Sequence, residues 1–329
     1  MNPAASLSES AAPPAFAALG QPLAPTRTPL LSGADPEAKR AELRRYFHQT
    51  CELYEGLLSL IRDDASYYER YEPLRHPLIF YFGHPAVFYV NKLIAGRLIQ
   101  ARIDPHLESM FAVGVDEMSW DDLNAAHYDW PSVRAVREYR QEMRARIDAF
   151  ICSMPLELPI RQDSPAWLIL MGIEHERIHL ETSSVIMRQM PLDELRRGEE
   201  LSDEERRLWA SCPTHGTPPP NEWLSVPATT VRLGKRSDDE TYGWDNEYGT
   251  DEVALPSFRA GRRLVSNAEF LEFIAAGGYR DDALWTDEGR GWLHYTRAEH
   301  PKFWMPRGPA TCSGTCWRRF PCRSIGRSR

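Results

Sequence analysis

The sequence has no apolar run that approaches the roughly twenty residues needed to cross a bilayer. Its Ala- and Pro-rich beginning also has no basic segment followed by an apolar stretch, so we expect a cytoplasmic protein without a membrane partner. The chain lacks a positive net charge as well, because its 47 acidic residues outnumber its 39 basic residues. This balance argues against nucleic acid as a partner.

Cysteine is scarce in the greater part of the chain. Cys51, Cys152 and Cys212 have neither metal-binding nor disulfide spacing, as expected of buried thiols in a reducing compartment. The other three of the six cysteines follow Pro306, together with six arginines and no acidic residue. We interpret residues 307–329 as an aberrant basic tail that begins where the reading frame is lost. A disordered basic tail is the alternative.

Composition and periodicity divide the chain into segments of different character. Residues 1–34 are rich in Ala, Pro and Ser with little charge, and we expect them to be disordered. Residues 35–190 have helical periodicity, whereas the charged and Pro-rich residues 191–222 are typical of a linker. Residues 223–306 combine short β-like segments, Gly-rich turns and one helix. The sequence therefore predicts a helical domain followed by an α+β domain.

Four long helices are expected in the first domain, which predicts a four-helix bundle. Their apolar side chains recur every three or four residues, and they span about 35–61, 84–103, 131–152 and 165–190. The second of them is expected to begin at His84 and Pro85, because proline favours the first turn of a helix. In the second domain, residues 226–233 are expected to be extended and residues 267–276 helical.

The most informative motif is a pair of histidines, His175 and His179, on the fourth predicted helix. Residues four apart lie side by side on a helix, so the two imidazoles could close on one metal ion. With Glu176 the motif is that of zinc proteases, in which this glutamate is the general base. With Glu181 it matches a non-haem metal pattern instead. Two helix histidines that bind nothing are the third interpretation.

A third ligand would decide between these interpretations, because a reactive metal needs about three protein ligands and open positions. The residues after the motif exclude the zinc-protease class that uses a third histidine. A zinc site could instead take Glu194 or Glu199, although both lie in a charged stretch typical of solvent. The other candidate is His84 on the neighbouring predicted helix. Glu181 lies about 200° around the helix from His179, which favours a role in the second shell.

Several longer stretches are shared with one enzyme family: Arg75–His84, Val115–Asp122 and Gly172–Ser184. They resemble the ovothiol-pathway 5-histidylcysteine sulfoxide synthases, which are relatives of the ergothioneine-pathway sulfoxide synthases. Tyr242–Glu247 and Val265–Phe270 are similar to the opening of formylglycine-generating-enzyme-like domains, which these synthases carry behind a DinB-like bundle. The resemblance covers about residues 25–306.

The resemblance implies a fold, a metal and a reaction. The fold is a DinB-like four-helix bundle followed by the N-terminal part of a formylglycine-generating-enzyme-like, or C-type-lectin-like, domain. The metal is a single iron(II) ion held by His84, His175 and His179, with Glu176 and Glu181 in the second shell rather than in catalysis. The reaction joins L-cysteine to L-histidine with O2 and gives 5-histidylcysteine sulfoxide. A zinc hydrolase that uses His175, Glu176 and His179 remains the alternative.

The chain also departs from this family. Family members have a longer second domain, which supplies a catalytic tyrosine, and many add a methyltransferase. Here the likeness stops near Pro306, so the catalytic residue is unknown and we expect the methyltransferase to be absent. We therefore expect iron binding with poor turnover.

Overall fold

The computed structural model describes residues 27–112, 128–205, 220–306 and 317–319. These residues fall into two compact units. The first unit extends to Glu205 and also takes in the later segment Asp238–Trp244, and the second holds the rest of the chain from Arg206 onward. The candidate site lies in the first unit.

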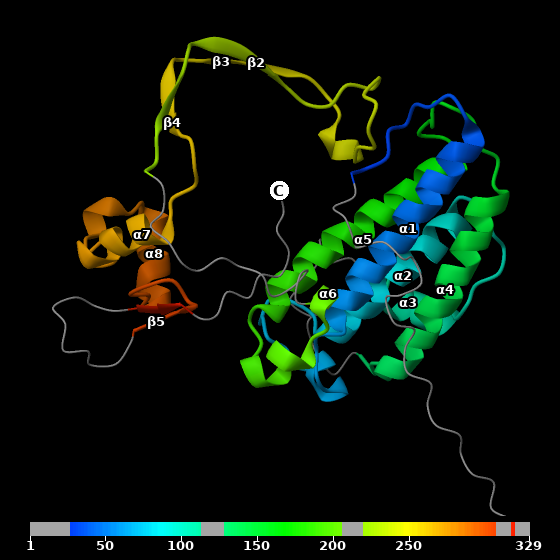
Figure 1. Cartoon of the computed structure of the whole chain (residues 1–329), viewed down its shortest axis with the longest axis horizontal. Helices are drawn as coiled ribbons and strands as arrows, with labels where there is room; N and C mark the ends of the chain where they lie inside the picture. The colour runs from blue at the N-terminus through cyan, green and yellow to red at the C-terminus, as the bar shows by residue number, and fades with distance from the viewer. Residues whose placement is uncertain (1–26, 113–127, 206–219, 307–316, 320–329) are drawn as a thin grey trace, which may run out of the picture. The chain divides into compact units, whose positions relative to one another are not determined.

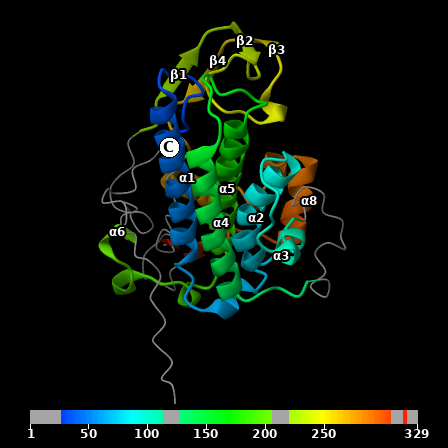
Figure 2. The same cartoon turned by 90° about the vertical axis from the view of Figure 1, so that its right-hand side faces the viewer.

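Four long helices form the first unit, as Figures 1 and 2 show. They are α1 (Pro36–Leu58), α2 (Leu78–Ala95), α4 (Val133–Ser153) and α5 (Pro165–Met187), with the short α3 (Pro105–Met110) beside α2. Both α1 and α2 pack against α4 and α5, so the four helices surround one apolar core. Side-chain caps fix three of the starts, since Asp35, Ser132 and Ser164 accept backbone N–H bonds from the first turns of α1, α4 and α5.

The sequence predicted α1, α4 and α5 to within about three residues, but its prediction for α2 was wrong at both ends. The helix begins at Leu78 because the apolar residues that precede His84 are buried in the core and continue the helix through Pro85. It ends at Ala95, and Arg97 then adopts a left-handed conformation with φ of 58°. His84 therefore lies in the middle of α2 and not at its N-terminus.

The proline inside α2 is tolerated because another side chain replaces the hydrogen bond that it removes. Proline has no N–H, so Pro85 cannot donate to the carbonyl of Tyr81 one turn earlier. The Tyr54 hydroxyl on α1 donates to that carbonyl instead, at 2.6 Å. The expected helix start at Pro85 thus failed because a contact between distant residues compensates the proline.

Helix α2 is, among the described residues, the one helix long and apolar enough to cross a membrane. However, 72% of its apolar window is buried within the folded chain. Its apolar character is accounted for by burial against α4 and α5, as in the central helix of a bundle.

Part of the expected linker packs on the bundle. Arg62, just after α1, forms an ion pair with Glu200 and donates its backbone N–H to the Glu194 carbonyl at 2.9 Å. Arg196 donates to the Ser59 carbonyl at 3.2 Å and pairs with Glu205 at 3.0 Å. The bundle therefore includes the chain up to Glu205, although the sequence places the linker at residues 191–222.

A segment from further along the chain, Asp238–Trp244, also packs on this unit. Thr241 forms a β-bridge with Leu30, and the backbone N–H of Leu31 donates to the Glu240 carbonyl at 2.7 Å. The ring of Tyr242 lies 4.8 Å from that of Trp167 in the first turn of α5. Residues before α1 and residues after the expected linker thus meet beside the N-terminal end of α5.

The second unit consists of paired strands and two helices. Strand β1 (Trp223–Val226) pairs antiparallel with β4 (Phe258–Gly261), and β2 (Thr229–Leu233) pairs with β3 (Asp251–Leu255). Strand β5 (Trp304–Pro306) pairs with β6 (Trp317–Arg319). The helices are α7 (Asn267–Ala275), which begins with a capping box between Ser266 and Glu269, and α8 (Asp287–Thr296). The predicted mixture of strands and a helix near residues 267–276 is confirmed, but the sequence did not predict α8, and the segment expected to be extended, residues 226–233, is divided between β1 and β2.

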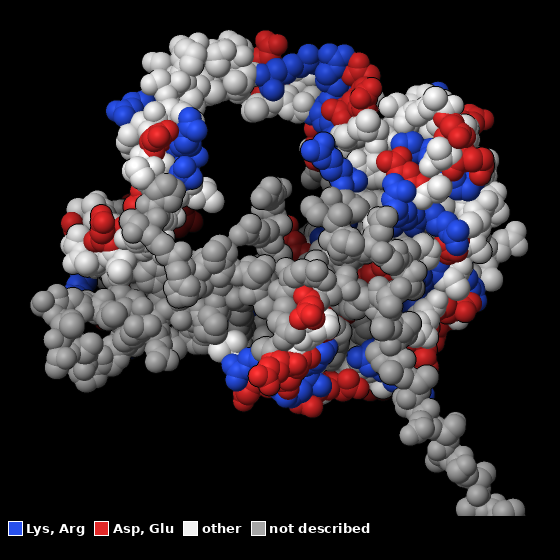
Figure 3. All heavy atoms as spheres, in the orientation of Figure 1, with Lys and Arg blue, Asp and Glu red and all other residues white. Residues whose placement is uncertain are grey.

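Charges of both signs are interspersed over the described surface of the bundle in the view of Figure 3. Cross-helix ion pairs contribute to this pattern, such as those of Arg44 with Asp148 and Arg144 with Glu52. The described part of this face therefore carries no broad basic surface of the kind that nucleic acids bind.

Helix α5 approaches α2 closely at Gly172, and this contact can be tested. A Cβ atom at this position would lie 2.3 Å from the Tyr89 ring, and the Tyr89 hydroxyl is already held by Glu176 at 3.1 Å. We expect Gly172→Ala to lower the free energy of unfolding by about 1–3 kcal/mol, measured by urea denaturation. Gly291→Ala in α8 is the control, because nothing lies within 4 Å of the added methyl group there. Equal stabilities of the two variants would contradict the close approach.

Candidate metal centre

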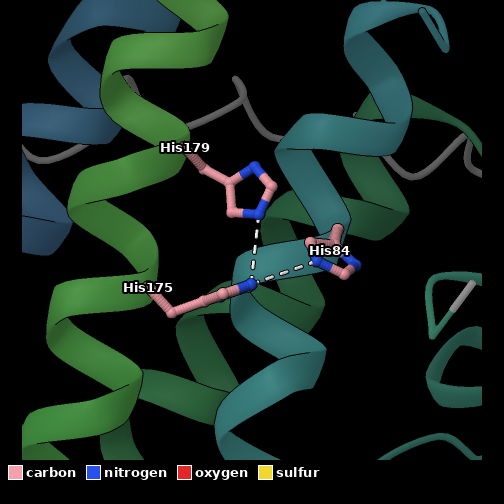
Figure 4. Close-up of side chains that lie close together, drawn as sticks. All are labelled: His84, His175 and His179. Atoms are coloured by element: carbon pink, nitrogen blue, oxygen red, sulfur yellow. Dashed lines mark hydrogen bonds between the residues drawn. The ribbon is translucent and has the colours of Figure 1, made fainter. Parts of the chain in front are cut away.

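Three histidines from two helices meet on one side of the bundle. His84 projects from α2, and His175 and His179 project from α5 toward it, as Figure 4 shows. The helices run antiparallel, because the Tyr89 end of α2 meets Gly172, near the start of α5. The i and i+4 spacing places both α5 imidazoles on the face that His84 meets. The structure thus brings together all three ligands that the sequence proposed.

The separations of the ring nitrogens fit a shared metal ion. The Nε2 atom of His175 lies 3.3 Å from that of His84 and 3.1 Å from that of His179. Ligands about 2.0–2.1 Å from a metal, at angles of 90–109°, lie about 2.8–3.4 Å apart. In the described chain, this is the one group of three metal-ligating side chains whose donor atoms lie within 4.8 Å of one another. Neither Glu194 nor Glu199 joins the group.

A backbone carbonyl orients the histidine of α2. The Nδ1 atom of His84 lies 2.6 Å from the carbonyl oxygen of Phe111, and only a protonated Nδ1 can donate to that oxygen. A neutral imidazole in this tautomer directs the lone pair of Nε2 toward the other two histidines. Gly83 makes the arrangement feasible, since a Cβ atom there would lie 2.5 Å from the Phe111 ring.

Burial keeps the two histidines of α5 uncharged. His175 stacks on Phe88 with ring centroids 3.7 Å apart, and His179 is only 6% exposed. Burial, followed by the effect of the neighbouring His179, lowers the pKa of His175 far below its ordinary value. Burial, followed by the effect of His84, lowers the pKa of His179 to about 3. Both imidazoles are therefore neutral near pH 7, which is the form that binds a metal.

Glu176, the general base of the zinc-protease interpretation, is occupied elsewhere. The side chain is fully buried, and its Oε1 atom accepts a 2.6 Å hydrogen bond from Arg140 of α4. Its Oε2 atom accepts from the Tyr89 hydroxyl at 3.1 Å and from the Cys51 thiol at 3.5 Å. With both oxygens bonded in the core, this carboxylate is not placed to activate a water molecule at the histidines.

The other sequence-predicted positions lie apart from the three rings or outside the described chain. Glu181 is exposed and lines a surface pocket with Glu72 and Arg75. The motif Val115–Asp122 falls outside the described residues. The carbonyl of Phe111, which orients His84, was not predicted from the sequence. Gly83, immediately before a candidate ligand, was the signal that another group approaches closely there.

A known protein family matches the segment that contains the three histidines. The sequence model of the DinB superfamily matches residues 20–183, so the helical unit is a DinB-like domain. The matched segment contains all three histidines. This defines the first unit as a DinB-like bundle with a histidine group that could hold a metal.

Enzymes of one biosynthetic group are among its relatives. The chain is 30% identical to the hercynine oxygenase of Mycolicibacterium smegmatis over 77% of its own length and 55% of that protein. It is 28% identical to the hercynine oxygenase of Mycolicibacterium thermoresistibile over 84% of this chain and 57% of the relative. It is also 25% identical to ergothioneine biosynthesis protein 1 of Neurospora crassa, over 61% of this chain and 24% of the relative. The chain thus spans about half the length of the hercynine oxygenases that it matches.

The buried neutral histidines predict how the stability of the metal-free protein depends on pH. In the unfolded chain a histidine gains a proton below about pH 6.5, whereas folded His175 and His179 stay neutral to a much lower pH. The unfolded state therefore binds more protons, and stability falls as the pH drops. We expect a loss of about 1 kcal/mol per pH unit for each histidine below pH 6, measured by denaturation in the presence of a chelator. The double variant His175→Asn and His179→Asn should show a distinctly smaller dependence, and an unchanged slope would contradict the assignment.

Proposed function

We propose that the protein is a non-haem iron(II) sulfoxide synthase, which uses O2 to join the sulfur of cysteine to an imidazole carbon of a histidine-type substrate. The observation that carries the proposal is the group of three imidazoles, His84, His175 and His179, in a DinB-like domain, in which burial keeps His175 and His179 neutral. Its similarity to proteins named hercynine oxygenase supports the same chemistry. The zinc-hydrolase alternative has no support, because Glu176 is bonded to Arg140.

The proposed reaction balances without an added reductant. The thiol S–H bond and one imidazole C–H bond are broken, and a C–S bond and an S=O bond are formed. One oxygen atom of O2 enters the sulfoxide and the other leaves as water with the two hydrogens. The two substrates together supply the four electrons that O2 accepts. Bound iron(II) would supply a place where thiolate and O2 can both bind.

The residues of this chain would hold such an ion from one side only. All three donors come from α2 and α5, and His175 is the least buried of the three. Three neutral donors leave the full charge of the metal available to an anionic thiolate. The Phe111 carbonyl keeps the proton of His84 on Nδ1, away from the site where the metal would bind.

The substrate and the second domain are finer parts of the proposal. The ovothiol-type motifs of the sequence favour L-histidine and L-cysteine as substrates, with 5-histidylcysteine sulfoxide as the product. Residues 223–306 would form the N-terminal part of a formylglycine-generating-enzyme-like domain. The support for this assignment is the similarity of Tyr242–Glu247 and Val265–Phe270 to that family.

Metal content tests the iron site. We expect about one iron per chain after anaerobic loading, and loss of that iron in His84→Ala, because two ligands on one helix are insufficient to hold it. His106→Ala is the control, since His106 is exposed and lies outside the group of three. Inductively coupled plasma mass spectrometry of the three proteins, with zinc measured alongside iron, gives the result. Full iron occupancy in His84→Ala, or a preference for zinc in the wild type, would overturn the assignment.

Product analysis tests the substrate. Iron-loaded protein is mixed with cysteine and O2, and with either L-histidine or hercynine, and the products are identified by mass spectrometry. We expect the sulfoxide from L-histidine in at least single-turnover amounts, and much less from hercynine. The reverse preference would place the protein with hercynine-specific enzymes. Absence of both products from iron-loaded protein would refute the synthase assignment while leaving the iron site intact.

A further inference from the structure

Two polar bridges link α2 to α5 near the histidine group, and neither contains one of the three histidines. The first begins at the Tyr81 carbonyl that Pro85 leaves without its helical partner. The Tyr54 hydroxyl of α1 donates to this carbonyl at 2.6 Å. Since its proton is then used, the same hydroxyl accepts from Ser183 of α5 at 2.9 Å. One buried hydroxyl thus ties three helices together.

The second bridge passes through Arg140 of α4. Its guanidinium is 1% exposed and donates to the Phe82 carbonyl of α2 at 3.2 Å and to Glu176 of α5 at 2.6 Å. It also donates to Glu55 of α1 at 3.1 Å. The Arg140 guanidinium carbon lies 5.3 Å from the centre of the Tyr54 ring, so the two bridges are in contact.

Both bridges attach to α2 and α5 close to the three histidines. On α2, Tyr81 and Phe82 are within three residues of His84. On α5, Glu176 follows His175 directly, and Ser183 is one turn beyond His179. The bridges therefore resist both sliding and rotation of α2 against α5 at the level of the three rings.

Register matters here because the histidine group is divided between the two helices. His175 and His179 keep their spacing wherever α5 lies, but the 3.3 Å separation from His84 depends on how α2 and α5 are aligned. Sliding by a single residue would move a side chain about 1.5 Å along the axis. Metal–ligand distances tolerate deviations of only about 0.2 Å, so a shift of this size would disrupt the site.

We propose that Tyr54 and Arg140 are positioning residues for the metal centre, which they serve by fixing the register of α2 against α5. The proposal rests on the proposed function, in that it takes the three histidines to bind a metal. Neither residue contacts a ligand histidine through the bonds described above, so each acts through the helices alone.

Tyr54→Phe is the sharpest test because it removes one oxygen and keeps the ring. Tyr67→Phe is the matched control, since this buried hydroxyl also donates to a carbonyl, that of Leu58 at 3.0 Å, but makes no bridge between α2 and α5. We expect Tyr54→Phe to bind Co²⁺ about tenfold more weakly than the wild type, with an altered visible absorption spectrum of the bound ion. Tyr67→Phe should bind with wild-type affinity and spectrum. Denaturation of each metal-free protein shows that the comparison is made between folded chains.

The Arg140 bridge requires a paired substitution. Arg140→Met alone leaves Glu176 buried without its partner and is expected to be strongly destabilising. The double variant Arg140→Met and Glu176→Met removes both charges, so it keeps an apolar core while losing the bridge. We expect it to fold and to bind Co²⁺ at least tenfold more weakly. Should Tyr54→Phe not fold, Ser183→Ala replaces it, because that change breaks only the α5 end of the first bridge.

The outcomes separate this inference from the function on which it rests. A wild-type chain that binds neither Co²⁺ nor Fe²⁺ overturns the proposed function and the inference with it. A wild-type chain that binds metal, with folded bridge variants of equal affinity and spectrum, overturns the inference alone. Weaker binding by both bridge variants, with an unchanged Tyr67→Phe control, supports it. Equal weakening in the control would show that general loss of stability is responsible and would also overturn it.

Discussion

The buried ion pair of Arg140 and Glu176 is the constraint on which the bundle depends. Removing two charges from water is costly unless their remaining hydrogen bonds are satisfied in the interior. Here the guanidinium also reaches Glu55 and the Phe82 carbonyl, and the carboxylate also accepts from Tyr89. One side chain on α4 therefore bonds to the other three long helices, which is a stronger restriction on their alignment than apolar packing alone provides.

This ion pair accounts for the different directions in which Glu176 and His175 of α5 point. Two adjacent residues in the polar part of this helix, His175 and Glu176, have different roles. Glu176 is directed into the core toward Arg140, whereas His175 lies about 100° further around the helix and meets His84. A motif that resembles the zinc-protease pattern in sequence thus contains no free base, because its carboxylate is part of the scaffold. The histidines next to it are left as neutral donors with a shared centre.

The bundle and the proposed chemistry are linked through this division of roles. A site for thiolate and O2 requires donors held on one side and open positions on the other. Helices α2 and α5 provide all three histidines, and the hydrogen bonds of Tyr54 and Arg140 link the two helices without using the imidazoles. The chain spans about half the length of the hercynine oxygenases that it matches, and the matched segment of the DinB superfamily contains the donor set.

The sequence by itself determined the elements that depend on neighbouring residues. Asp35, Ser164 and the apolar spacing placed three helices, and the i, i+4 spacing placed the candidate ligands His175 and His179 on one face. Only the tertiary structure decided the course of α2 through Pro85, the tautomer of His84 and the role of Glu176. The physical reason is that each depends on a hydrogen bond with a residue distant in the chain, namely Tyr54, Phe111 and Arg140. A local sequence pattern cannot identify such partners, because they come together only when the helices pack.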